Sequence, residues 1–166
     1  VAGGVGFFMP TARAADIYVA TNATPAPPYN TWPSAYTNLQ AALDGASPGD
    51  TIYLAGHSFV QTQALEWNQS RITWRGGYEA TNATGLGSND PARWPTVVTR
   101  DPAFNIRLMS MVAVSNAVIE RVTFKEGNTW LSGTTNWNQG AGLYVLNVTN
   151  LTLDTCRFIG NLAGYQ

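Results

Sequence analysis

Apolar and polar residues follow the same order in two segments of the chain, 116–124 and 150–158. Each segment begins with an asparagine, Asn116 or Asn150, and ends with a phenylalanine. The positions expected to point inward are the pairs Ala117/Leu151, Ile119/Leu153, Val122/Cys156 and Phe124/Phe158. A short strand that repeats with a fixed asparagine at its corner is typical of a solenoid, in which each turn rests on the turn below.

The two asparagines have a predicted structural role. Neighbouring turns of a solenoid lie about 4.8 Å apart, so Asn116 and Asn150 are expected to stack with an amide donor of one on the amide acceptor of the other. Such an asparagine ladder would hold a buried corner without leaving polar groups unpaired.

The pattern near the N-terminus predicts a strand at 16–20, followed by a loop and a helix. The helix is expected to have Ser34 as its N-cap and Gly45 at its end. Leu39, Ala42 and Leu43 share one apolar face of this helix, which predicts that it packs against the first turn of the solenoid as a cap.

Further strands are predicted at 51–55, 71–74, 96–99 and 107–114, with surface loops at 79–95 and 127–140. The apolar pairs Ile52/Leu54 and Ile72/Trp74 are twenty residues apart, which predicts one compact turn of that length.

The two ends of the sequence suggest a domain organisation. Residues 1–14 combine an apolar run around Phe7 and Phe8 with Ala12 and Ala14, as in the second part of a secretory signal peptide. This run is too short to span a bilayer. We expect residues 15–50 to form the first strand and the capping helix, and residues 51–166 to form solenoid turns that are incomplete at the C-terminus.

Composition excludes several classes of partner. The net charge is −1 and Lys125 is the sole lysine, which gives no electrostatic reason to expect nucleic acid or an anionic membrane. The single cysteine, Cys156, excludes an intrachain disulfide and is expected to be a buried thiol. No cofactor or metal is expected, and the oligomeric state is left open.

Longer motifs resemble a known family. Residues 17–19, 39–43 and 46–56 look like the opening of secreted bacterial right-handed parallel β-helix proteins, and Arg75-Gly76-Gly77-Tyr78 resembles their next segment. Residues 140–144 and 156–161 are similar to repeats of polymorphic outer-membrane-type and pectin-lyase-like surface proteins. The resemblance implies an all-β fold, a right-handed parallel β-helix with a short N-terminal capping helix. It leaves the activity open, because lyases, hydrolases and adhesins share this scaffold.

No residue is assigned a catalytic role. The closest candidate is Glu120 over Asp154 with Arg121 beside them, since a lyase would need clustered acids and a raised base. Two acids at adjacent corners are more often solvated turn residues, and this interpretation is favoured. His57, the sole histidine, is interpreted as a structural turn residue.

The loop at 127–140 is the predicted ligand contact. Trp130 and Trp137 can stack on sugar rings, and the amides of Asn136 and Asn138 can bind hydroxyl groups. The low charge of the loop favours a neutral glycan or cell-surface polysaccharide. The alternative is a hydrophobic flap in which both indoles are buried.

Two functions of different class follow. The preferred one is a non-catalytic extracellular or cell-surface protein that serves as a structural stalk, with adhesion or glycan contact. The alternative is the N-terminal part of a polysaccharide lyase or glycoside hydrolase whose catalytic turns lie beyond Gln166.

Overall fold

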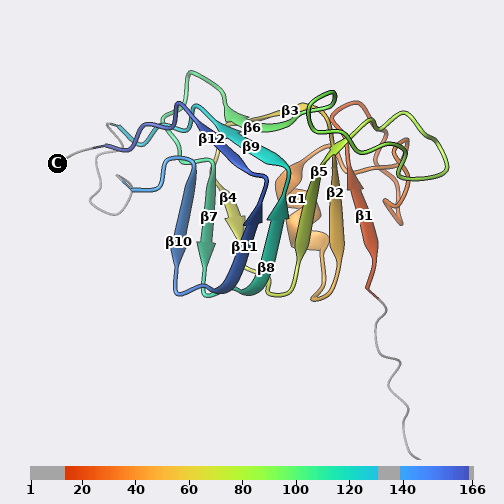
Figure 1. Cartoon of the computed structure of the whole chain (residues 1–166), viewed down its shortest axis with the longest axis horizontal. Coiled ribbons are helices and arrows are strands. Elements are labelled where there is room, and N and C mark those ends of the chain that lie inside the picture. The colour runs from red at the N-terminus through yellow and green to blue at the C-terminus, as the bar shows by residue number, and fades with distance from the viewer. Residues whose placement is uncertain (1–13, 131–138, 165–166) are drawn as a thin grey trace, which may run out of the picture.

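The computed structural model of the protein describes residues 14–130 and 139–164, which form mostly β-strands together with one helix (Figure 1). The elements in chain order are β1 (Asp16–Val19), α1 (Leu39–Gly45), β2 (Thr51–Ala55), β3 (Ser58–Gln61), β4 (Leu65–Trp67), β5 (Thr73–Tyr78), β6 (Thr96–Arg100), β7 (Met109–Val112), β8 (Ser115–Glu120), β9 (Val122–Lys125), β10 (Leu143–Leu146), β11 (Thr149–Asp154) and β12 (Arg157–Ile159). The strand predicted at 51–55 has the observed bounds, whereas the pattern does not predict the short strands β3 and β4.

The strands form three sheets, and all strand pairs within them are parallel. The chain contributes strands to the three sheets in a fixed order. The first sheet has the order β1-β2-β5-β8-β11, the second β3-β6-β9-β12 and the third β4-β7-β10. From β2 onward the chain contributes one strand to each sheet in turn before it returns to the first. We call one such passage through the three sheets a circuit. Each strand pairs with its counterpart in the preceding circuit.

The register confirms pairs predicted from the internal repeat. The Cα partners between β8 and β11 include Ala117/Leu151 and Ile119/Leu153. Between β9 and β12, Phe124 is the Cα partner of Phe158, and their rings stack with centroids 5.2 Å apart and planes at 11°.

The predicted length of the earlier turn is wrong by two residues. A spacing of twenty pairs Ile52 with Ile72, but in the structure Ile52 pairs with Trp74. Ile72 precedes β5 and follows Arg71, whose φ of 61° turns the chain into the strand. Since Ile72 and Trp74 are both fully buried, the apolar pattern does not distinguish the two registers.

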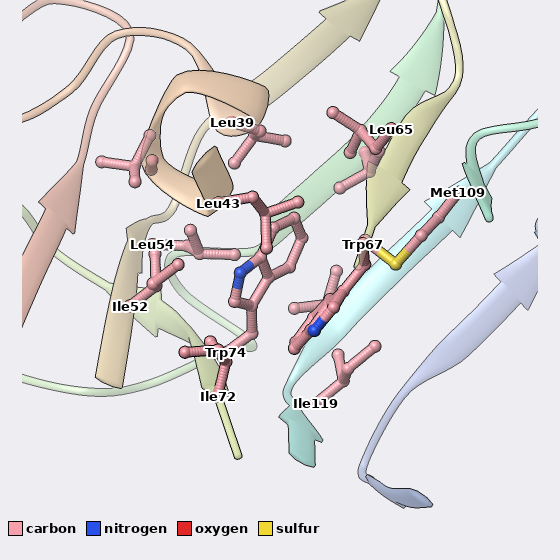
Figure 2. Close-up of a cluster of buried hydrophobic side chains, with 14 of the residues drawn as sticks. Leu39, Leu43, Ile52, Leu54, Leu65, Trp67, Ile72, Trp74, Met109 and Ile119 are labelled. Atoms are coloured by element: carbon pink, nitrogen blue, oxygen red, sulfur yellow. The ribbon is translucent and has the colours of Figure 1, made fainter. Parts of the chain in front are cut away.

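The main apolar core draws side chains from all three sheets and from α1. Trp67 of β4 and Trp74 of β5 pack with ring centroids 5.2 Å apart, and both are fully buried. Leu39 and Leu43 of α1 join the same cluster next to Leu54 (Figure 2). Burying one large apolar side chain contributes roughly 1.5–3 kcal/mol, so these leucines anchor the helix to the strands.

The N-cap of the helix lies four residues after the predicted one. The Ser34 hydroxyl is engaged with Thr31 Oγ1 at 2.7 Å, whereas Asn38 Oδ1 accepts a hydrogen bond from the Ala41 N–H at 2.9 Å. Asn38 is therefore the N-cap, and Gly45 is the last helical residue, as predicted.

Two strand edges are covered by groups outside the sheets. β4 is an edge of the third sheet, where the Glu66 N–H donates to Gln40 Oε1 at 2.8 Å and Gln40 Nε2 donates to the Glu66 carbonyl at 3.0 Å. β1 is an edge of the first sheet, where the Tyr18 N–H donates to the Tyr29 carbonyl at 2.7 Å and the Tyr36 N–H donates to the Tyr18 carbonyl at 2.8 Å. Paired edges do not recruit further strands.

A second apolar cluster lies on the outer face of the first sheet. Tyr18, Tyr53 and Tyr78 form a row in which neighbouring rings are 5.5 and 5.4 Å apart. Trp32 packs on Tyr18, and its Nε1 donates to the Leu86 carbonyl at 3.0 Å. The loop after β1 and the loop after β5 therefore meet over this face.

A buried hydroxyl joins the first sheet to the start of β6. Thr96 is 1% exposed, and its Oγ1 donates to the Ala55 carbonyl at 2.7 Å and accepts from the Gly77 N–H at 2.9 Å. Valine has nearly the same shape but cannot accept that N–H.

We expect Thr96→Val to lower the free energy of unfolding by about 1–3 kcal/mol, because the Gly77 N–H would stay buried without a partner. Urea denaturation measures this change. Thr152→Val, at an exposed position of β11, is the control and is expected to have little effect. Equal losses in the two variants would contradict a special role for the Thr96 hydroxyl.

Candidate functional site

The predicted glycan-binding loop is described only in part. Trp130 is 44% exposed, and its backbone N–H donates to Asn128 Oδ1 at 2.8 Å. Asn136, Trp137 and Asn138 lie outside the described residues. The Trp130 indole is thus accessible, and glycan contact through this loop stays a prediction.

The structure brings the two predicted ladder asparagines together. Asn150 Nδ2 donates to Asn116 Oδ1 at 2.9 Å. The expectation of a buried corner is wrong, because both side chains are exposed. Their backbones are in the left-handed region, with φ of 54° at each residue. The backbone of Arg71 is also in the left-handed region, and its backbone N–H donates to the Ser115 carbonyl at 2.9 Å.

Asparagine adopts left-handed backbone more readily than most residues, so conformation is the main reason for its recurrence here. We expect Asn150→Leu to destabilise the protein by about 1 kcal/mol through backbone strain, and Asn150→Gly to have a smaller effect. Thermal or urea unfolding separates the two. A larger loss with glycine than with leucine would show that the amide bond outweighs the conformation.

One member of the acidic pair considered for catalysis, Glu120, forms ion pairs with two arginines. Glu120 and Asp154 are Cα partners on neighbouring strands. Glu120 Oε2 lies 3.1 Å from Arg75 Nε and 3.2 Å from Arg121 Nη1. A carboxylate oxygen held by two guanidinium groups is occupied by ion pairs and is not free to contact a substrate proton. This arrangement supports the interpretation of the pair as structural.

These residues belong to a longer row across the first sheet. The Cα partners run from Tyr18 to Tyr53, Arg75, Glu120 and Asp154 on five successive strands. Burial raises the pKa of Tyr53, so its phenol stays protonated at neutral pH. The sequence predicted Glu120 over Asp154 but not their alignment with Tyr18, Tyr53 and Arg75, because the members of the row are separated by unequal numbers of residues.

The sole histidine connects two loops. The Thr21 N–H donates to His57 Nδ1 at 3.2 Å, and Thr21 Oγ1 lies 3.0 Å from the same atom. Partial burial lowers the pKa of His57. The neutral ring is the form that accepts the N–H bond, in agreement with a structural role at the turn between β2 and β3.

Because the folded pKa of His57 lies below its unfolded value, the unfolded state binds more protons, and stability is expected to rise with pH. We expect the melting temperature to fall as the pH is lowered through about 6.5, the unfolded pKa. His57→Gln keeps a hydrogen-bonding side chain that does not titrate, so its melting temperature should vary less between pH 8 and pH 5.5. A variant with the full pH dependence of the parent would contradict this assignment.

Cys156 is partly buried against the preceding circuit. Its Sγ donates to the Ile119 carbonyl at 3.3 Å, and burial raises the pKa of the thiol. A protonated, hydrogen-bonded thiol is a poor nucleophile, so the geometry favours packing.

No protein-family model, curated protein or solved structure matches the chain. Within residues 14–130 and 139–164, no helix combines the length and hydropathy needed to cross a membrane. Among the same residues, no group of three or more His, Cys, Asp or Glu side chains could hold a metal ion.

Proposed function

We propose that this chain is a non-catalytic structural segment of an extracellular or cell-surface protein, built as a right-handed parallel β-helix that serves as a rigid stalk. The carrying observation is the in-register parallel pairing of each circuit with the next in all three sheets. Parallel strands joined by crossovers are almost always right-handed, which supports the handedness.

Stiffness follows from this pairing. Hydrogen bonds between circuits run along one axis in three sheets, and one continuous apolar core fills the space between them. Bending such a stack would break backbone hydrogen bonds on one side and compress side chains on the other. A spacer needs this resistance, and it requires no catalytic group.

Exposed apolar side chains in the last circuit support the proposal that further circuits can stack in the same way. Leu153 and Phe158 are 41% and 47% exposed, whereas their partners Ile119 and Phe124 are fully buried. Val145 of β10 is 42% exposed, and its partner Met111 is fully buried. A coil placed on this face with the same register would bury Leu153, Phe158 and Val145, as β10–β12 bury their partners in the preceding circuit.

Export and glycan contact complete the proposal. The apolar run at 1–14 supports export, although it lies outside the described residues. The exposed Trp130 supports contact with a neutral glycan as a feature added to the stalk.

The proposed stalk is tested by adding circuits and measuring whether the molecule lengthens by an equal step for each one. Inserting three tandem copies of residues 127–160 after Gly160 preserves the register in which β11 and β12 pair with β8 and β9. We expect the longest dimension in small-angle X-ray scattering to grow by roughly 14 Å, three times the strand spacing. The β content measured by circular dichroism should rise in proportion.

The matched control carries the same copies with one residue deleted inside each copy of β11, which moves the apolar side chains to the outer face. This control is expected to aggregate or to leave the added segment unfolded. If the register-preserving insert also stayed unfolded, stacking would depend on features of the existing circuits, and the proposed stalk would be wrong.

A further inference from the structure

A groove of about 220 Å³ lies beside the corner between the first and second sheets. Its lining consists of Pro91, Ala92, Pro95 and Thr96 from the turn before β6 and its first residue, together with Arg121, Thr123, Thr155 and Arg157. Its described lining residues include two arginines and no carboxylate. No described residue of the predicted glycan loop lines the groove.

Strand register brings these four polar residues together. Arg157 of β12 is the Cα partner of Thr123 of β9. Arg121 and Thr155 occupy equivalent corners of successive circuits, with φ of 58° and 53°. The backbone N–H of Arg121 donates to the Asp154 carbonyl at 2.9 Å, so the corner of one circuit lies against the corner of the next.

The charge around the groove is positive. Arg75 and Arg121 share the single carboxylate of Glu120 at 3.1 and 3.2 Å. Asp154 accepts a hydrogen bond from Thr155 Oγ1 at 2.9 Å and is exposed. Three guanidinium groups, with Arg157 included, therefore face two carboxylates. The excess of one positive charge is available to an anion in the groove.

We propose that this groove binds a tetrahedral oxyanion, a sulfate or phosphate group carried on a small molecule or on a single sugar unit. Arg121 and Arg157 would supply the charged contacts, and the hydroxyl group of Thr123 one further donor.

The number of donors distinguishes the anion. Three donor side chains, Arg121, Thr123 and Arg157, match the three or four oxygen atoms of a tetrahedral group, whereas a carboxylate offers two. The volume is below the roughly 300 Å³ at which drug-sized ligands begin to fit. A single anionic group fits such a space, and a long oligosaccharide would have to extend out of it.

Nuclear magnetic resonance titration of the full chain tests the proposal. Sodium sulfate and sodium phosphate are added at constant ionic strength, with acetate and glucose as the carboxylate and neutral comparisons. We expect saturable shifts at the amides of Thr123, Thr155 and Arg157 with sulfate or phosphate, and weaker effects with acetate or glucose. Glucose 6-sulfate and glucose 6-phosphate then identify which ester the groove prefers.

Arg157→Gln is the principal variant, because Arg157 is exposed and its loss should leave the fold intact. It is expected to weaken binding about tenfold. Arg71→Gln is the matched control, since Arg71 is exposed and does not line the groove. Non-saturating shifts, equal weakening in both variants, or acetate binding as tight as sulfate would each overturn the proposal. This test is independent of the stalk, because it requires neither export nor added circuits.

Discussion

Parallel hydrogen bonding between a strand and its counterpart one circuit earlier is the constraint on which the other features depend. Residues Thr51, Thr73, Val118 and Thr152 are successive Cα partners, although stretches of chain of very different length separate them. The loops after β5 and β9 absorb the difference. Backbone pairing fixes the place of each strand in space, so the core and the surface rows follow from register and not from distance along the chain.

The corners impose the second constraint. Several equivalent corners of successive circuits place both residues in left-handed backbone: Ala113/Asn147, Asn116/Asn150, Arg121/Thr155 and Glu126/Gly160. Only one of these residues is glycine, so the corners carry strain that must be offset by strand pairing and burial. Asparagine is one of the residues that tolerate this conformation. Its recurrence therefore reflects backbone geometry first and the exposed amide contact second.

Much of the architecture was predictable where the sequence repeats itself. The pairing of Ile119 with Leu153 and of Phe124 with Phe158 follows from the internal repeat of residues 116–124 and 150–158. Ile52 was harder to place, because two buried residues, Ile72 and Trp74, competed as its partner. The row from Tyr53 to Arg75 and Glu120, and the groove with Arg157, could not be read from the sequence. Such sites form only when unequal loops return the strands to one register.

The circuits differ in length while their strands stay in register, and this has an evolutionary consequence. An insertion or deletion in the excursion between β5 and β6 changes the outer surface while the neighbours across the stack stay the same. A single-residue change inside a strand such as β8 instead moves every following side chain to the opposite face. Length variation is thus confined to the loops. The loops can diverge rapidly in size and chemistry, while the strands preserve the same stack of partners.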